Sequence, residues 1–462
     1  MTPPFRYRVS EREKDALLTE QAALIERLVA RVQALDARVA ELEALLAKPK
    51  KTSQNSHTPP SQDRKPGGTG GKKHGKRRQP RPSRPGSARP LSAVPDETIK
   101  RLATACPHCA ADVSGQTQRC RHRYDHIDLP PITPVVTRIE LFGGRCAGCG
   151  HRFRAAPPDG MPPGTPFGAR IRSLLLYLHH GHHAGFERLS RMMDELFGLS
   201  ISEGAIAGVF RRAAGAMTTA CAAIREKLKA ARVIASDETT ARIDGAGHWH
   251  WVFVTAKAVL HTIAPRRAKA VAEAVLGGHR PDVWVSDRYA GQQDLAPAHQ
   301  VCLAHLLRDV QYAIDCGDTV FAPRLRELLR WAIRIGRRRD ALRPASLAAY
   351  HARAERRLDA LVATPAAHPA GRALQTAVKA WRTKFFVFLD DPGVPATNNA
   401  CEREIRPSVV FRKVTGGFRS DWGAEIHAGY RSVTATARLH GQTALEAINH
   451  LLAGTFEPSI AS

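Results

Sequence analysis

Three acidic residues have the types and spacing for chemistry on phosphate groups. Asp237 and Asp287 each end a short apolar segment, and Glu402 lies at the start of a helical pattern far downstream. If the two segments are neighbouring strands, the aspartates come together, where they repel each other unless a divalent cation lies between them. Carboxylate oxygens suit Mg²⁺ or Mn²⁺. The sequence therefore predicts a two-metal site whose ligands and catalytic residues are Asp237, Asp287 and Glu402.

In such a site, one metal ion activates the attacking water or 3′-hydroxyl and the other stabilises the leaving 3′-oxygen. Each acid also has a simpler interpretation. An aspartate at a strand end is often only a cap, and Glu402 fits a solvated helix start with i,i+4 ion pairs. The combination of all three acids favours the metal site.

Basic residues follow Glu402 closely, which suits a polyanionic substrate. The chain has 69 Lys and Arg against 43 Asp and Glu, a formal net charge of +26 and an isoelectric point near 10.3. Such an excess indicates a nucleic-acid partner, which we expect to be double-stranded DNA. The residues near Glu402 that we expect to contact DNA are Arg403, Arg406, Arg412, Lys413 and Arg419.

Residues 231–420 have the pattern of an α/β domain that could position the acids. Three strands, a helix, two strands and a helix follow one another, which is the order of the ribonuclease H-like fold. Asp287 and Glu402 are 115 residues apart, and residues 311–390 indicate a helical insertion between them. The expected strands are 233–237, 248–254, 259–263, 283–287 and 299–304, with a helix at 266–276 and a turn at 242–247.

Two C-x-x-C motifs predict a structural zinc ribbon in residues 101–156. Four thiolates at two hairpin tips bind zinc tetrahedrally and leave no position for water. A redox function explains two such motifs less well. Short strands are expected between them, in residues 124–142. The expected zinc ligands are Cys106, Cys109, Cys146 and Cys149.

Residues 1–50 predict a leucine-zipper-like coiled coil. Apolar residues recur at spacings of three and four in residues 25–46, which favours a homodimer or higher oligomer through residues 18–46. Packing of this helix on its own domain is the alternative. Residues 51–100 are basic and rich in Gly and Pro, so we expect a disordered linker, which either contacts phosphates or acts only as a spacer. Its expected DNA contacts are Lys72, Lys73, Lys76, Arg77 and Arg78.

Helical patterns fill the remaining segments. Residues 157–230 contain three, and the Gly-containing turn before the third gives the outline of a DNA-binding helix-turn-helix, although an ordinary helical core would look alike. The histidines of residues 179–183 are expected at the surface or core edge rather than on a metal. Residues 421–462 are expected to form a C-terminal helical hairpin.

The chain shows neither a membrane-spanning apolar run nor a signal peptide. We therefore expect a cytoplasmic, nucleoid-associated protein without a membrane partner. Its nine cysteines are then more suitable as metal ligands and buried thiols than as disulfides.

The order of these segments resembles the IS66 family of bacterial insertion-sequence transposases over nearly the whole chain. The most specific matching motifs are CLAHLLRD at 302–309 and NNACER at 398–403. The resemblance implies DDE chemistry by Asp237, Asp287 and Glu402, which is hydrolytic nicking at transposon ends followed by joining of the 3′-ends to target DNA. It also implies accessory proteins from the same element.

Some residues have more than one interpretation within this resemblance. Cys302 and His305 are similar to a C-x-x-H motif that follows the second Asp in several transposase families, but a packed thiol and a capping histidine fit equally well. Glu404 is a rival of Glu402, although two helical positions away it should face elsewhere. Two other functions stay open, a non-catalytic end-binding repressor of the same fold and a zinc-ribbon nuclease.

Overall fold

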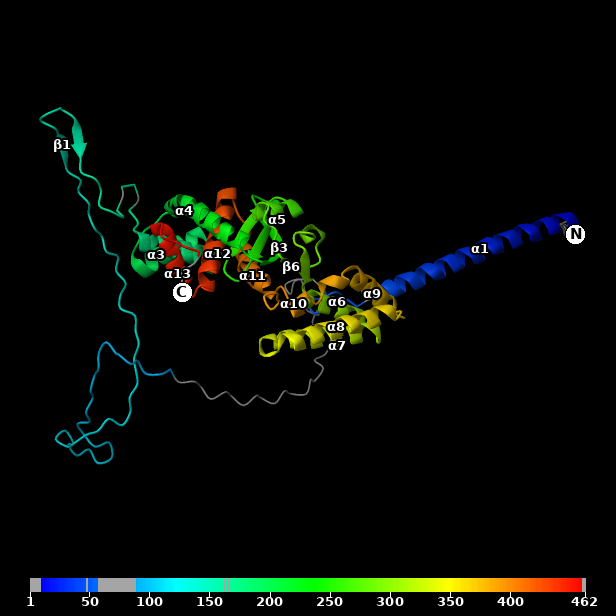
Figure 1. The fold of residues 1–462 in the computed structure, drawn as a ribbon, viewed down its shortest axis with the longest axis horizontal. Coiled ribbons are helices and arrows are strands. Elements are labelled where there is room, and N and C mark those ends of the chain that lie inside the picture. Colours follow the sequence, from blue (N-terminus) through cyan, green and yellow to red (C-terminus); the bar gives the residue numbers. More distant parts are fainter. Residues whose placement is uncertain (1–9, 47–48, 57–88, 162, 165, 459–462) are drawn as a thin grey trace, which may run out of the picture. The chain divides into compact units, whose positions relative to one another are not determined.

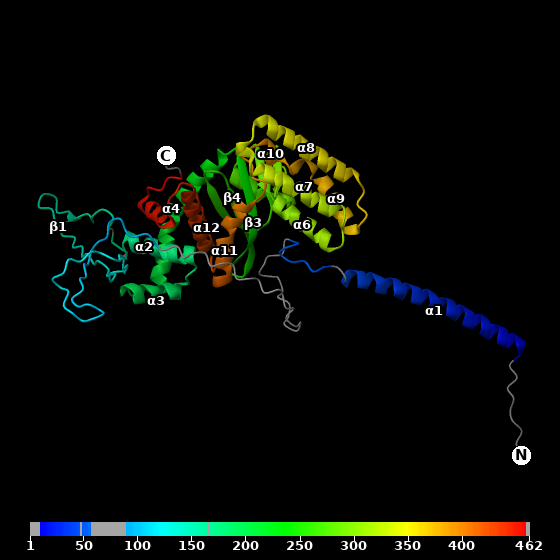
Figure 2. The same ribbon diagram turned by 90° about the horizontal axis from the view of Figure 1, so that it is seen from below.

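The structure is a computed structural model, shown in Figures 1 and 2, and it divides into two compact units. The core unit comprises residues 1–63, 167–184 and 208–462, and the second unit comprises residues 64–166 and 185–207. Among the described helices, none has both the length and the apolar character needed to span a bilayer. The residues that the structure describes are 10–46, 49–56, 89–161, 163–164 and 166–458.

The core unit is a mixed α/β structure around a five-stranded sheet of order β5-β4-β3-β6-β7. The strands β3, β4 and β5 are antiparallel neighbours, while β6 and β7 run parallel to β3. The chain order of three strands, helix α5, two strands and helix α6 agrees with the predicted order. These elements span Val233–Ile243 (β3), Ala246–Val254 (β4), Val259–Ala264 (β5), Lys269–Leu276 (α5), Val283–Ser286 (β6), Ala298–Val301 (β7) and Leu303–Asp315 (α6).

The largest differences from the predicted strand boundaries lie at the ends of β3 and β7. Strand β3 does not end at Asp237 but continues to Ile243, because β4 supplies backbone partners for its polar second half. The turn between them is shorter than expected. It consists of Asp244 and Gly245, both with positive φ (47° and 78°), as a two-residue hairpin requires. Strand β7 ends at Val301, because Cys302 is already the N-cap of α6.

Helices α11 (Asn399–Thr415) and α12 (Asp421–Leu439) lie against the antiparallel half of the sheet (Figure 2). Two α12 hydroxyls bond to the edge strand β5, where Ser432 Oγ accepts from His261 N at 2.8 Å and Thr436 Oγ1 from Val259 N at 3.0 Å. Helix α13 (Ala444–Ala453) follows α12. The helices that precede β3 in the core unit are α2 (Ala169–Leu176), the π-helix η2 (Tyr177–Gly181) and α4 (Glu203–Lys229). The first residues of α4 belong to the second unit.

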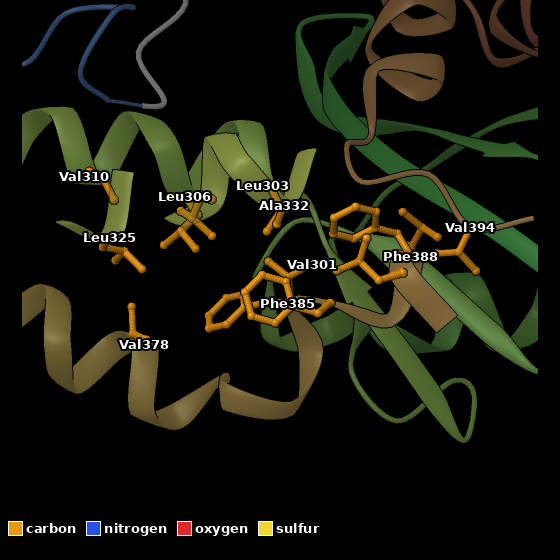
Figure 3. Close-up of a cluster of buried hydrophobic side chains, with 14 of the residues drawn as sticks. Val301, Leu303, Leu306, Val310, Leu325, Ala332, Val378, Phe385, Phe388 and Val394 are labelled. Atoms are coloured by element: carbon orange, nitrogen blue, oxygen red, sulfur yellow. The ribbon is translucent and has the colours of Figure 1, made fainter. Parts of the chain in front are cut away.

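The segment predicted as a helical insertion contains four helices that share one hydrophobic core with α6 and the parallel strands (Figure 3). Leu306 and Val310 of α6 point towards Leu325 and Val378, and Phe385 lies near Val301, the last residue of β7. This packing holds the start of α6 in place beside the sheet. The helices are α7 (Phe321–Gly336), α8 (Pro344–Ala363), α9 (Pro369–Ala380) and α10 (Val387–Asp390), with short 3₁₀ turns at Arg339–Ala341 (η4) and Arg382–Lys384 (η5). A further 3₁₀ turn, η3 (Ala290–Gln292), lies between β6 and β7.

The predicted coiled-coil segment is a single helix, α1 (Glu11–Leu46), with a capping pair of Ser10 and Glu13 at its start. Apolar side chains on its predicted seam, such as Ile25 and Leu28, are more than half exposed in this single chain. Self-association through this helix stays a prediction. The basic linker residues Lys72, Lys73, Lys76, Arg77 and Arg78 lie outside the described residues.

In the second unit, both C-x-x-C motifs form tight turns. Ala110 N donates to Cys106 O and Gly150 N to Cys146 O, and Ala110 and Gly150 have positive φ. Strands β1 (Gly143–Arg145) and β2 (Arg152–Arg154) flank the second turn, and helix α3 (Phe186–Phe197) belongs to this unit. The strands expected in residues 124–142 are absent from the described chain, where three prolines remove backbone donors from any ladder.

Candidate active site

Asp237 and Asp287 lie at equivalent positions of adjacent parallel strands. The register pairs Ala235 of β3 with Val285 of β6, and each aspartate follows its paired residue by two positions. Asp287 comes directly after the last residue of β6, while β3 continues beyond Asp237. The structure thus brings together the two acids that the sequence analysis had placed at neighbouring strand ends.

Asp237 occupies the most unfavourable position for a negative charge. Its Oδ1 accepts a hydrogen bond from Glu238 N at 2.9 Å. Burial is the first cause that raises the pKa of Asp237 well above its usual value. The negative charges of Glu238, Asp287 and Glu402 raise this pKa further, so all four acids lie within electrostatic reach of one another.

Glu402 enters the site from the first turn of α11, which is anchored to both the sheet and α6. Asn398, at the N-cap, is fully buried; its Nδ2 donates to Ser236 O at 2.8 Å and its backbone N to Cys302 Sγ at 3.1 Å. These bonds place the helix start beside β3. Glu402 Oε1 lies 3.5 Å from His305 Nε2 and 3.8 Å from an Arg308 nitrogen.

Glu404, the rival acid, faces a different part of the core unit. Its carboxylate contacts Arg431 at 3.2 Å and Arg438 at 3.4 Å, both on α12. Between the two acids of this helix turn, Glu402 is therefore the one directed towards the aspartates' side of the sheet.

The structure does not gather all predicted metal ligands. Within the described residues, one group of three or more possible ligands has donor atoms all within 4.8 Å of one another, and it is Cys302, His305 and Glu402. The three predicted Mg²⁺ ligands do not converge this closely, because the Glu402 carboxylate lies beside His305. The two cysteine pairs Cys106/Cys109 and Cys146/Cys149 are likewise not joined into a four-ligand group.

Glu238 is a buried acid of this site that the sequence analysis did not single out. It points to the opposite face of β3 from Asp237, since strand side chains alternate. Its carboxylate is 1% exposed and pairs with Arg267, whose Nε donates at 2.7 Å, and with Gln292. Arg267 lies over the rings of Tyr289 (3.8 Å) and Trp249 (4.9 Å). Burial and then Asp287 raise the pKa of Glu238, while Arg267 opposes them.

Replacing Arg267 with alanine is expected to lower the free energy of unfolding by about 1–3 kcal/mol, measured by urea unfolding at neutral pH. Loss of one partner leaves a buried carboxylate uncompensated, which costs roughly 3–5 kcal/mol in a fully buried pair. The effect is smaller here because Arg267 is 34% exposed and Gln292 remains. Arg266→Ala, at the exposed neighbouring position, is the matched control, and equal losses in both variants would contradict the role of Arg267.

The predicted DNA-contacting residues near Glu402 differ in solvent exposure and in the hydrogen bonds that they make within the protein. Arg403, Arg406, Lys413 and Arg419 are exposed. Arg412 is half-buried and donates to Thr240 O and, at 2.5 Å, to Thr240 Oγ1, so its guanidinium joins α11 to β3. Three of the exposed four, Arg403, Arg406 and Lys413, lie on α11, the helix that carries Glu402.

An acidic site on a mixed sheet, with exposed arginines on the helix that carries Glu402, suits a nucleic-acid substrate. The comparison with protein families is consistent with this: the family described as Transposase IS66 family matches residues 164–426, more than half of the chain. The chain therefore belongs to the IS66 family of transposases, and the resemblance noted in the sequence is confirmed. A comparison with curated proteins gives no significant match. The family match includes the acidic site and leaves α1 and both cysteine motifs outside.

Proposed function

We propose that this protein is a DDE transposase that binds the ends of an insertion sequence, cleaves the DNA and joins the 3′-ends to target DNA. The observation that carries the proposal is the shared register of Asp237 and Asp287 on adjacent parallel strands, with Glu402 on the helix beside them. The strand order β5-β4-β3-β6-β7, with β4 antiparallel to β5 and β3 and with β6 and β7 parallel to β3, supports a ribonuclease H-like core.

The donor set fits Mg²⁺. All three acids offer oxygen ligands, which Mg²⁺ prefers, and a buried carboxylate beside three others calls for a compensating cation. Mg²⁺ bound there would supply Lewis-acid activation of the attacking hydroxyl and stabilisation of the leaving 3′-oxygen. Because Glu402 lies beside His305, ligation of one ion by all three acids requires its side chain to turn towards the aspartates.

The chain's other residues have supporting roles in this proposal. Arg267 and Gln292 hold Glu238 and so fix β3 behind Asp237. The exposed Arg403, Arg406 and Lys413 bind phosphates, which positions DNA without reading its sequence. We further propose that the cysteine pairs close on structural zinc as a ribbon, and that α1 pairs two protomers into a dimer that holds two transposon ends.

The proposal is tested with full-length protein and labelled DNA carrying the element's own ends. We expect cleavage and joining of the 3′-ends with Mg²⁺ or Mn²⁺ and none in EDTA or with Ca²⁺. Cleavage without joining would favour a nuclease instead. Binding without cleavage, in the presence of the element's accessory proteins, would favour an end-binding repressor.

A further inference from the structure

A second group of possible metal ligands lies next to the three acids. Cys302 is the N-cap of α6, His305 is in the first turn of the same helix, and Glu402 is in the first turn of α11. Their Sγ, imidazole nitrogen and carboxylate oxygen all lie within 4.8 Å of one another. Two anchored helix starts thus present three different donor types to one point.

The distance between two of these donors agrees with metal binding. His305 Nε2 and Glu402 Oε1 are 3.5 Å apart, which is long for a hydrogen bond. Two ligands each about 2.0–2.1 Å from a tetrahedral zinc ion are roughly 3.3–3.4 Å apart. The sequence spacing also fits, since residues i and i+3 lie on one face of a helix.

One buried atom of the group lacks a hydrogen bond. Glu402 Oε1 is shielded from solvent and has no hydrogen-bond partner in the described chain. A buried carboxylate oxygen without a donor is unfavourable, and such atoms call for an ion or another partner. Arg308 lies 3.8 Å away, beyond hydrogen-bonding distance, and its side chain is 28% exposed, so it can withdraw towards solvent when a cation binds.

We propose that Cys302, His305 and Glu402 form a Zn²⁺ site that is distinct from the Mg²⁺ site and shares one ligand with it. A thiolate and an imidazole select a borderline cation such as Zn²⁺ or Co²⁺ over Mg²⁺. Binding forms a metal–sulfur bond and releases the thiol proton to solvent. Three protein ligands leave a fourth position for water, as in open zinc sites.

The shared ligand makes the two metals antagonists, and this consequence rests on the proposed function. When Glu402 is bound beside Cys302 and His305, it is not available to the ion held by Asp237 and Asp287. Zinc therefore inhibits Mg²⁺-dependent cleavage, and an excess of Mg²⁺ does not fully restore it.

Co²⁺ titration of the full-length protein tests the site without any DNA. The protein is first given one equivalent of Zn²⁺ to occupy the cysteine pairs of the second unit, and the near-ultraviolet thiolate-to-Co²⁺ absorption band is then followed. We expect a band in the wild type that is lost in Cys302→Ser, with Co²⁺ affinity reduced more than about tenfold in His305→Gln. Cys316→Ser, at the other end of α6, is the matched control and keeps the band.

Identical titrations of the wild type and Cys302→Ser would overturn the proposal, and thermal unfolding of each variant shows whether it is folded. His305→Gln replaces a partly exposed side chain, so it tests the site even if the buried Cys302→Ser does not fold. A band that forms while zinc leaves cleavage unchanged would overturn the antagonism alone. A band in a protein that never cleaves DNA supports the zinc site and counts only against the transposase mechanism.

Discussion

Replacing Asp237, Asp287 or Glu402 by its amide, one at a time, is expected to reduce Mg²⁺-dependent cleavage by at least about 10³-fold. Loss of a metal ligand removes several kcal/mol of transition-state stabilisation, and each 1.4 kcal/mol is tenfold in rate. DNA binding should stay close to that of the wild type, because the proposed phosphate contacts come from other residues. Cleavage kinetics and a binding titration on the same labelled DNA measure the two effects separately.

Among these variants, Asp237→Asn is expected to change cleavage and stability in opposite directions. Burial and three neighbouring acids raise the pKa of Asp237, so its ionised form destabilises the fold. For a carboxyl group with a raised pKa, stability is fully present below the unfolded-state pKa and is lost as pH rises through the folded-state pKa. At neutral pH, Asp237→Asn is therefore expected to raise the melting temperature of the metal-free protein while it abolishes cleavage.

Glu404→Gln is the matched control for Glu402→Gln. It changes an acid on the same helix turn that is paired with Arg431 and Arg438 of α12. We expect reduced stability but retained cleavage at a temperature where the variant is folded. If Glu404→Gln abolished cleavage and Glu402→Gln did not, the assignment of the third acid would be wrong.

Local patterns in the sequence were sufficient to predict the order of strands and the pairing of Asp237 with Asp287. Both acids follow short apolar segments that contain β-branched residues, and such segments are readily recognised as buried strands. The extension of β3 to Ile243 was missed, because its polar second half depends on pairing with β4. The Asp244–Gly245 dipeptide is a strong hairpin signal and would have placed the turn correctly.

The parts of the site that were missed depend on long-range contacts. Glu238 is recognised as buried only when Arg267 and Gln292, 29 and 54 residues away, are seen to contact it. The approach of Glu402 to His305 likewise joins two helix starts far apart in sequence. In residues 124–142 the sequence analysis predicted strands that the structure does not contain. Neighbouring β-branched residues suggested strands there, but the described chain has no partner strand for them.

The histidines of residues 179–183 were expected at the surface or core edge, but the structure places one of them, His180, in a buried histidine cluster. His180 Nδ1 lies 3.3 Å from His427 Nδ1, and His250 Nε2 lies 3.0 Å from His261 Nδ1. All four are buried. Two adjacent imidazoles can share a hydrogen bond only if one of the facing nitrogens is unprotonated. Each pair therefore needs at least one neutral ring.

Acid is therefore expected to destabilise this protein as the pH falls below about 6.5, where unfolding lets the buried rings take up protons. Burial lowers the pKa of His250 to about 3, with smaller contributions from Arg431 and Arg412. Burial is also the main cause that lowers the pKa values of His180, His261 and His427. A depressed folded-state pKa gives stability that is present above the unfolded-state value of about 6.5 and is lost as pH falls.

The expected loss is about 1.4 kcal/mol per pH unit for each such histidine between pH 6.5 and 5, measured as the urea-unfolding free energy. His250→Gln retains a hydrogen-bonding group beside His261 but does not titrate. The slope of its unfolding free energy against pH should therefore be smaller by up to about 1.4 kcal/mol per pH unit, the contribution of one proton. His182→Gln changes an exposed histidine two residues from His180 and is the control with the wild-type slope. Equal slopes in all three proteins would mean that protonation of this cluster does not limit acid stability, and that the rings adapt their packing to the charge.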